Sequence, residues 1–452
     1  MIIVPQAQGR RYMVMGLGIS GLATVQSLRA SQADVWAWDD EESLRAQAVT
    51  MGAQVCPLEE IGWASLAALV LSPGIPHTHP HPHVSAQKAR EANVPIICDL
   101  DLLAQAQPQA QYVGVTGTNG KSTTTALIGH LLKTGGQSFQ VGGNIGAAAL
   151  ALEPLEKGAT YILELSSYQL ERVPHLELDI AVLLNIAPDH LARHGGMEGY
   201  VAVKKSIFEH GRKKSGFAGI VGMEDPYGRA VYKELKSKYR LFCVSGQTRE
   251  DICVERGILY DENHPVLDLS GHPVLLGLHN AQNVAAAYAA GKLLGIRQAD
   301  LIDGIKSFKG LPHRLEIIGE CEGVRFVNDS KATNANAVAK ALACFDQIYW
   351  ILGGQAKENG LAGLEVFYPR IRHAFLLGEA TERFAATLKG RVDFTTCGTL
   401  EKAVREAFGR ARRDPGQPVV LLSPACASWD QFRNFEHRGQ VFREAFEGLK
   451  MT

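Results

Sequence analysis

The chain has 452 residues, 46% of them hydrophobic, and a formal net charge of −1. This length exceeds what one hydrophobic core supports, so several domains are expected. The balanced charge predicts no nucleic-acid partner, and without an apolar run of bilayer length we expect no membrane insertion. The N-terminal sequence lacks the features of a secretory signal, and the 8 cysteines include no C-x-x-C pair. A cytoplasmic location with reduced thiols is therefore predicted.

The first part of the chain alternates apolar runs with helical stretches, a pattern typical of parallel strands with crossover helices. The expected strands are Tyr12–Met15, Val35–Trp38, Ala68–Leu71 and Pro95–Cys98. A G-x-G-x-x-G motif at residues 16–21 follows the first strand, and Asp39 or Asp40 lies near the distance of a ribose-binding carboxylate. The motif alone indicates a dinucleotide-binding dehydrogenase. A UDP-sugar offers the same diphosphate and ribose, and glycines that serve only tight packing are a further alternative.

Four histidines alternate with other residues from His77 to His83. Two prolines in this segment exclude a helix that could direct the rings toward one ion, and no carboxylate lies among them. The segment is therefore predicted to be a solvated loop and not a metal site.

A phosphate-binding loop is predicted at residues 113–125, which read VGVTGTNGKSTTT. An apolar strand (Tyr112–Val115) leads into a glycine-rich turn, and a helix is expected from Thr123 to Leu132. Backbone N–H groups of such a turn bind phosphate oxygens, Lys121 neutralises the β- and γ-phosphates, and Ser122 can ligate Mg²⁺. Val115 stands where the common pattern has its first glycine. The motif predicts a nucleoside triphosphate site.

Two further strands of this region end in polar residues. Glu164 follows an apolar strand, where a second Mg²⁺ anchor is expected; a solvent-facing strand end is the alternative. His190 follows the buried strand that begins at Ala181 and should lie near the same phosphates.

Other polar residues of the central region have simpler interpretations. Composition alone assigns Lys204 and Lys205, within the helical stretch Tyr200–Phe208, to solvent. Asn280 and Asn283 open an alanine-rich helix, where capping is the expected role and contact with a base the alternative.

A linker is predicted around residues 310–314, and a second α/β alternation follows it. Its expected strands are Val324–Asn328, Ile348–Leu352, Ala374–Leu377, Val392–Thr395 and Val419–Leu422. Polar loops follow three of these strands, at the edge where open α/β sheets bind ligands. We therefore expect three α/β domains, of residues 1–100, 101–310 and 311–452, with ligands held by loops of all three.

Six motifs in this order resemble the Mur ligase family: GTNGKST, ELSSYQL, NIAPDHL, HNAQN, GLPHR and NDSKATN. The resemblance covers nearly the whole chain. It implies a Rossmann-like N-terminal domain, a central P-loop ATPase domain with a mainly parallel sheet, and a Rossmann-like C-terminal domain. Within the family, SPACASWDQFRNFEHRG is most similar to members that add D-glutamate to UDP-N-acetylmuramoyl-L-alanine during peptidoglycan precursor synthesis. Other amino-acid-adding members and folate polyglutamate ligases remain alternatives.

The resemblance implies an ATP-dependent amide ligase with an acyl-phosphate intermediate, two Mg²⁺ ions and no partner beyond its substrates, expected as a monomer. It implies catalytic roles for Lys121, His190 and Lys204, with a carbamate on Lys204. The implied metal ligands are Ser122, Glu164, His190 and Lys204.

The resemblance also implies three sets of binding residues. ATP is expected at Gly117, Thr118, Asn119, Gly120, Lys121, Ser122, Thr123, Asn283, Arg314, Asp329 and Lys331. The UDP-substrate is expected at Gly18, Ile19, Ser20, Asp39, Ser72, Gly74 and Asn144. D-Glutamate is expected at Thr333, Lys357, Ser428 and Phe435, although core packing is an equal alternative for Phe435.

An ATP-gated binding protein that never turns over is a further alternative. It would bind ATP tightly but release no phosphate with any amino acid.

Overall fold

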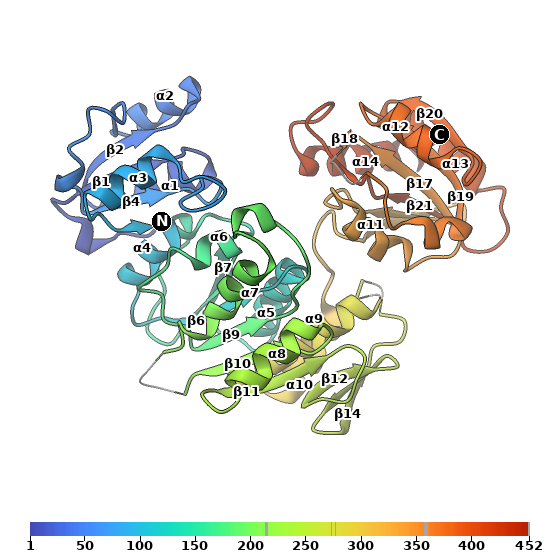
Figure 1. Ribbon diagram of the computed structural model, residues 1–452. Helices are drawn as coiled ribbons and strands as arrows, with labels where there is room; N and C mark the ends of the chain where they lie inside the picture. Colours follow the sequence, from blue (N-terminus) through green and yellow to red (C-terminus); the bar gives the residue numbers. More distant parts are fainter. Residues whose placement is uncertain (213–215, 273, 276, 357–359, 451–452) are drawn as a thin grey trace. The chain divides into compact units, whose positions relative to one another are not determined.

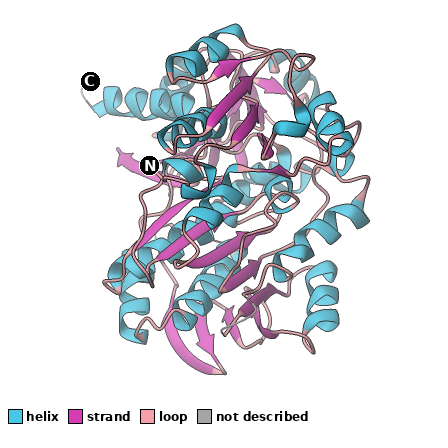
Figure 2. Ribbon diagram, turned by 90° about the vertical axis from the view of Figure 1, so that its left-hand side faces the viewer, coloured by secondary structure: helices cyan, strands magenta, loops and turns pink. Residues whose placement is uncertain are grey.

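The computed structural model describes residues 1–212, 216–272, 274–275, 277–356 and 360–450. They form two compact units, one of residues 1–270 and 280–307 and the other of residues 271–279 and 308–452. The first unit contains two of the three large sheets and the second unit contains the third. In Figure 2 each sheet lies among helices, as the α/β prediction requires. The predicted domain boundary near residue 100 remains a prediction.

The first sheet is parallel and has the strand order β3-β2-β1-β4-β5, with the change of direction between β1 and β4 that marks the ligand crevice of a doubly wound sheet. Its helices α1, α3 and α4 are seen beside it in Figure 1. The elements are β1 (Arg11–Met15), α1 (Ile19–Ala30), β2 (Asp34–Trp38), α2 (Glu42–Thr50), β3 (Gln54–Val55), β4 (Ala68–Leu71), α3 (Val84–Glu91), β5 (Ile96–Ile97) and α4 (Asp99–Ala106).

The second sheet has the order β14-β13-β12-β11-β10-β9-β6-β8-β7, so the strand before the phosphate loop, β6, lies between β8 and β9. Its strands are β6 (Gln111–Thr116), β7 (Phe139–Gly143), β8 (Thr160–Glu164), β9 (Ile180–Leu183), β10 (Ala218–Gly222), β11 (Arg240–Ser245), β12 (Ile252–Glu255), β13 (Ile258–Asp261) and β14 (His264–Asp268). Its helices are α5 (Lys121–Thr134), α6 (Ser167–Leu170), α7 (Met197–Lys205), α8 (Pro226–Leu235), α9 (Leu278–Leu293) and α10 (Gln298–Ser307). The last pairings, β12 with β13 and β13 with β14, are antiparallel and were not expected from the sequence.

The third sheet has the order β15-β16-β21-β17-β19-β20 and is parallel except for the β15–β16 pair. Its strands are β15 (Glu316–Cys321), β16 (Val324–Asn328), β17 (Ile348–Gly353), β19 (Ile371–Leu377), β20 (Phe394–Gly398) and β21 (Val419–Leu422), and β18 (Gln355–Ala356) pairs with β22 (Cys426–Ala427). Its helices are α11 (Ala335–Leu342), α12 (Thr381–Leu388), α13 (Leu400–Ala411) and α14 (Phe435–Lys450).

Local chemistry explains where several elements begin. A capping box of Ser166 and Gln169 starts α6, and Asp225 caps α8, whose first residue is a proline. Asn334 caps α11 through the N–H of Ala337. The predicted strands Ala68–Leu71, Val324–Asn328 and Val419–Leu422 are confirmed, because their four or five apolar residues are almost all buried on both faces of a parallel sheet.

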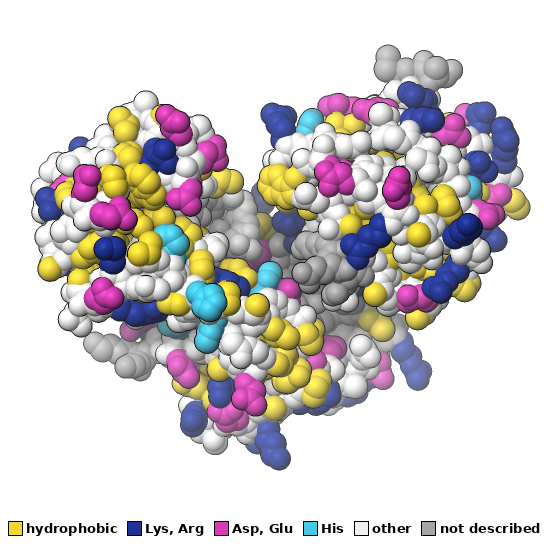
Figure 3. Space-filling view, turned by 45° about the horizontal axis from the view of Figure 1, so that its top comes forward, with side chains coloured by type: hydrophobic (Ala, Val, Ile, Leu, Met, Phe, Trp, Pro, Cys, Tyr) yellow, Lys and Arg dark blue, Asp and Glu magenta, His cyan; other side chains and the backbone are white. Residues whose placement is uncertain are grey.

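One hydrophobic core extends through both sheets of the first unit. It joins Val14 and Val70 of the first sheet to Tyr161 and Leu183 of the second through buried leucines of α4. The sheet of the second unit has buried clusters on its two faces. On the face drawn in Figure 3, the described basic and acidic side chains are interspersed, so charge for anion binding must come from individual side chains. Among the described residues, no helix is long and apolar enough to cross a membrane.

Candidate active site

The phosphate loop joins β6 to α5 and has the conformation predicted from its sequence. Gly117 and Gly120 have φ values of 151° and 87°, a region that side-chain-bearing residues rarely adopt. A Cβ at Gly120 would lie 2.2 Å from Asn283 Oδ1. Asn185 holds the loop by accepting from the N–H groups of Thr118 and Asn119 through its carbonyl oxygen and its side-chain oxygen. The loop is thus built for backbone N–H groups to approach an anion at the start of α5.

Two lysines direct their ammonium groups at one carbonyl of this loop. Nζ of Lys121 lies 2.8 Å from Gly117 O, and Nζ of Lys204 lies 2.9 Å from the same oxygen. Lys204 is 1% exposed and its ammonium also lies over the Tyr200 ring. Burial, and then the charge of Lys121, lowers the pKa of Lys204 well below its ordinary value. The prediction from composition that this lysine faces solvent is therefore wrong.

Lys205 is the solvent lysine of the pair. Its Nζ forms an ion pair with Glu234 at 2.8 Å. Successive residues on a helix point about 100° apart, and α7 packs with one side on the phosphate loop. Tertiary packing therefore distinguishes two neighbouring lysines that composition treats alike.

Glu164, at the end of β8, is 2% exposed, so the alternative of a solvent-facing strand end is wrong. Its Oε1 accepts from Asn144 Nδ2 at 2.9 Å, whereas its Oε2 is buried and has no hydrogen-bond partner within the described parts of the chain. A buried carboxylate oxygen without a donor is costly unless a cation binds it. With Ser122 at the start of α5, Glu164 fits the oxygen ligands that Mg²⁺ prefers.

His190 follows β9 and has a left-handed backbone, with φ 51°. Its ring is about half exposed, lies 3.5 Å from a carboxylate oxygen of Asp189 and packs at 5.3 Å from the Tyr168 ring. Asp189 and Glu164 both act electrostatically on Lys204, so the ends of β8 and β9 meet at the phosphate loop between them. The structure thus brings together the residues predicted at the three strand ends.

The histidine-rich segment is only partly solvated, which corrects the sequence prediction. The side chain of His77 is 12% exposed, and Nδ1 lies 3.7 Å from Glu171. Burial, as the largest cause, lowers the pKa of His77 to about 4. His83 caps α3 by accepting from the N–H of Ser85. The sequence could not reveal these partners because they lie on other elements.

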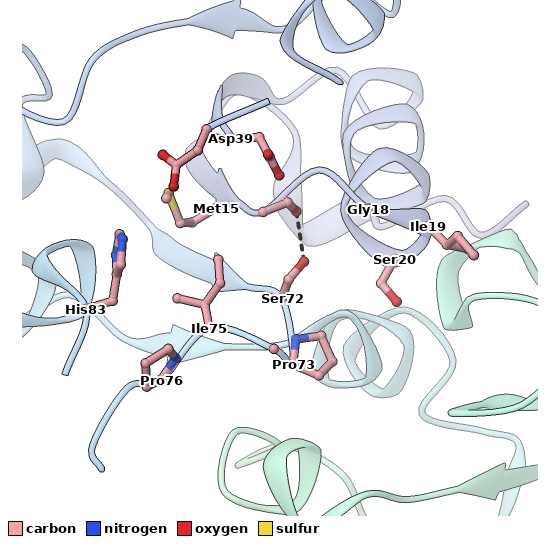
Figure 4. A pocket seen from close by; sticks show the side chains of 13 residues that line it. Met15, Gly18, Ile19, Ser20, Asp39, Ser72, Pro73, Ile75, Pro76 and His83 are labelled. Atoms are coloured by element: carbon pink, nitrogen blue, oxygen red, sulfur yellow. Dashed lines mark hydrogen bonds between the residues drawn. The ribbon is translucent and has the colours of Figure 1, made fainter. Parts of the chain in front are cut away.

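The nucleotide crevice of the first sheet is a cavity of about 550 Å³ (Figure 4). The six UDP-substrate residues predicted in the first domain all line it: Gly18, Ile19, Ser20, Asp39, Ser72 and Gly74. Ser72 Oγ donates to Gly16 O, the dashed bond of Figure 4, and Asp39 accepts from the N–H groups of Leu17 and Glu41. These bonds fix the glycine motif against the ends of β2 and β4. Asn144 lies elsewhere, beside Glu164.

Asn283 is 1% exposed and lies within α9 at the phosphate loop, where it accepts from the Thr124 hydroxyl and donates to Asn280. The expectation that Asn280 and Asn283 cap this helix is wrong, because α9 already begins at Leu278. Gln282 was not singled out from the sequence, yet it connects the Asn185 side chain to Leu184 O.

The loops of the second unit form a separate group of polar side chains. Asp329 accepts from Ser423 Oγ at 2.8 Å and from Leu315 N at 3.2 Å, and burial raises its pKa to about 7. The Lys331 ammonium lies 4.8 Å from the centre of the Phe435 ring. Phe435 is only partly buried, which makes core packing an incomplete account of it.

The other residues predicted in this unit are placed less closely. Thr333 and Arg314 are partly buried, Ser428 is 2% exposed, and Lys357 lies outside the described residues. The fully buried Arg438, which sequence reasoning missed, donates to Ser330 and to the carbonyl of Cys426. It thereby ties the loop after β16 to the loop after β21.

A phosphate loop, a buried carboxylate and a buried lysine at the ends of parallel strands define a P-loop nucleotide-binding protein. Residues 115–291 match the model of the Mur ligase middle domain, and residues 313–426 match that of the Mur ligase, glutamate ligase domain. The chain belongs to the Mur ligase family.

Curated relatives support this membership over the full length. The chain is 51% identical to UDP-N-acetylmuramoylalanine--D-glutamate ligase of Paramagnetospirillum magneticum, with 99% of both chains covered. It is 49% identical to the protein of the same name from Rhodospirillum rubrum, covering 99% of this chain and 96% of the relative. The dehydrogenase alternative for the first glycine motif is therefore wrong.

Solved structures agree on the fold. UDP-N-acetylmuramate-alanine ligase from Thermotoga maritima superposes with a TM-score of 0.62 at 17% identity, covering 97% of this chain and 99% of that one. MurF from Acinetobacter baumannii superposes with a TM-score of 0.62 at 17% identity, covering 92% of this chain and 91% of that one. At these identities the likeness concerns the fold alone.

Proposed function

We propose that this protein is an ATP-dependent ligase that joins the terminal carboxyl of UDP-N-acetylmuramoyl-L-alanine to the amine of D-glutamate, in the cytoplasm. The observation that carries the chemistry is the meeting of Lys121, Lys204 and Glu164 around the phosphate loop. The substrate pair follows from membership of the family and from the names of the relatives at 49% and 51% identity.

The chemistry begins when a carboxylate oxygen of the UDP-substrate attacks the γ-phosphorus of ATP. A new O–P bond forms, the bond to the β-phosphate oxygen breaks, and ADP leaves. The amine of D-glutamate then attacks the acyl phosphate, loses a proton and displaces inorganic phosphate. Both reactants of the first step are anions, so the site must offset their repulsion.

The residues of the chain divide this work. Lys121 and the backbone N–H groups of the phosphate loop bind the phosphates and neutralise charge that develops on them. Ser122, Glu164 and His190 would hold Mg²⁺, which supplies positive charge to the transferring phosphoryl group. The buried Oε2 of Glu164 supports this assignment, because a cation would satisfy it.

A carbamate on Lys204 is part of the proposal. Attack on CO₂ requires a neutral amine, and burial beside Lys121 favours the neutral form of Lys204. The amine nitrogen forms a bond to carbon and releases a proton, so a cation becomes an anion that can bind a metal. This exchange would relieve the repulsion between two ammonium groups that share Gly117 O.

The loops of the second unit are proposed to bind the adenosine end of ATP, through Asn283, Arg314, Asp329 and Lys331, and D-glutamate. The D-glutamate residues would be Thr333, Lys357, Ser428 and Phe435. Hydroxyls and a lysine suit a substrate with two carboxylates.

The test is an amino-acid panel. ADP release should require both UDP-N-acetylmuramoyl-L-alanine and D-glutamate, with L-glutamate a poor substrate. Equal turnover with L-glutamate, L-lysine or diaminopimelate would reassign the amino-acid substrate. ATP binding without phosphate release on any amino acid would instead support the non-catalytic alternative.

A further inference from the structure

We propose that Arg193 is a positioning residue that fixes the wall of the UDP-substrate cavity to the segment carrying His190. The inference rests on the proposed function and concerns how the bound substrate is presented to the phosphate loop. Arg193 ends a short 3-10 helix (Leu191–Arg193) that begins directly after His190.

The wall consists of the segment after β4, and Ser72, Pro73, Gly74, Ile75 and Pro76 all line the cavity (Figure 4). Its two prolines lack an N–H, and the segment turns away from the sheet, so its carbonyls are not paired as in a strand. Side-chain donors from elsewhere must therefore hold it in place.

Arg193 supplies such donors. Nη1 donates to His79 O at 3.1 Å, and Nη2 lies 3.4 Å from the carbonyls of Pro73 and Ile75. The guanidinium also lies 4.7 Å from the centre of the Tyr168 ring, which packs on His190 on its other side of contact at 5.3 Å. One side chain thus contacts both the cavity wall and the aromatic support of a proposed metal ligand.

Close packing restricts the same junction. A Cβ at Gly195 would lie 3.1 Å from His79 Nε2, so the segment after Arg193 leaves no room for movement against the histidine-rich loop. The fully buried Arg172 reinforces the wall from below by donating to the carbonyls of Leu71, Ser72 and Pro73. The two arginines differ in exposure. Arg172 is part of the core, whereas Arg193 is partly exposed and can be replaced with less damage to folding.

A positioning role predicts a specific kinetic pattern. Arg193→Ala should raise the KM for UDP-N-acetylmuramoyl-L-alanine about tenfold and lower kcat about tenfold, because the carboxyl is presented less accurately to ATP. The KM for ATP should change less than about twofold, since the phosphate loop is held by Asn185 and not by Arg193. Arg193→Lys should keep most of the defect, because an ammonium cannot span the carbonyls that a guanidinium contacts.

The matched control is Arg29→Ala. Arg29 also donates to a backbone carbonyl, that of Ala33, in the same unit but outside the cavity lining. It should leave both KM values unchanged.

The experiment combines steady-state kinetics, thermal unfolding and calorimetric titration of the wild type with UDP-N-acetylmuramoyl-L-alanine. Unchanged kinetics of Arg193→Ala, full activity of Arg193→Lys, or a parallel loss of ATP affinity and Tm would each overturn the inference. If Arg193→Ala does not fold, Arg193→Lys is judged by the same criteria. A wild type that neither binds this substrate nor ligates it would overturn the proposed function itself, a result distinct from an active wild type with an unaffected variant.

Discussion

The sharpest prediction concerns Lys204 and its neighbour Lys205. Lys204→Met should retain much of the buried volume and remove only the nitrogen, and Gly117 O would still accept from Lys121. The Tm should therefore change little, and loss of a desolvated ammonium would offset part of any packing defect. Activity should fall sharply, because no carbamate can form.

The expected magnitude follows from the position of Lys204. Removing one preorganised group that stabilises the reacting phosphoryl typically costs about 10²–10³ in kcat. Lys204→Ala should lose activity to a similar degree and also stability, because about four buried methylenes at roughly 0.8 kcal/mol each are lost. Its cavity gives a small carboxylate room to enter, so added acetate should partly restore the activity of Lys204→Ala but not of Lys204→Met.

The assay is ADP release with both substrates, with and without acetate, next to thermal unfolding. Lys205→Met is the matched control on the same helix, and because Lys205 forms only a surface ion pair, its variant should retain near-wild-type turnover. Loss of activity in Lys205→Met with an active Lys204→Met would refute the reasoning from burial. Equal activity of both variants would refute a role for either lysine.

Three further predictions follow from buried groups. Gly120→Ala should lower ATP affinity at least about tenfold in calorimetry, because φ 87° strains alanine and its Cβ would meet Asn283; wild-type affinity would contradict this. Relative to Asp329→Asn, the wild type should lose roughly 2–3 kcal/mol of urea-unfolding free energy from pH 5 to 8. The folded state, with the pKa raised to about 7, holds the proton that stabilises it only below that pH; a difference independent of pH would refute it. Arg438→Met should cost about 3–5 kcal/mol, since buried carbonyls lose their donor. Arg370→Met, which removes a surface bond to Ala343 O, should cost far less, and equal losses would argue against this account.

Much of the fold was predictable because its signals are local. Apolar runs such as Ala68–Leu71 form strands that are buried on both faces, and a glycine-rich turn with Lys121 has one dominant conformation. The antiparallel strands β12–β14 were missed, since their pairing depends on partners and not on the apolar pattern. The six cavity residues of the first sheet were found because β1 and β4 place their following turns at one crevice.

The sequence by itself determined the phosphate loop, the three α/β sheets and the family, because each depends on short motifs with their own chemistry. Only the tertiary structure decided that Lys204 is buried and Lys205 is not, that His77 is enclosed, and that Arg172, Arg193 and Arg438 bind loop carbonyls. The physical reason is that burial and hydrogen-bond partners come from elements far apart in the chain. Composition records only which groups are available, and packing decides which of them lose water.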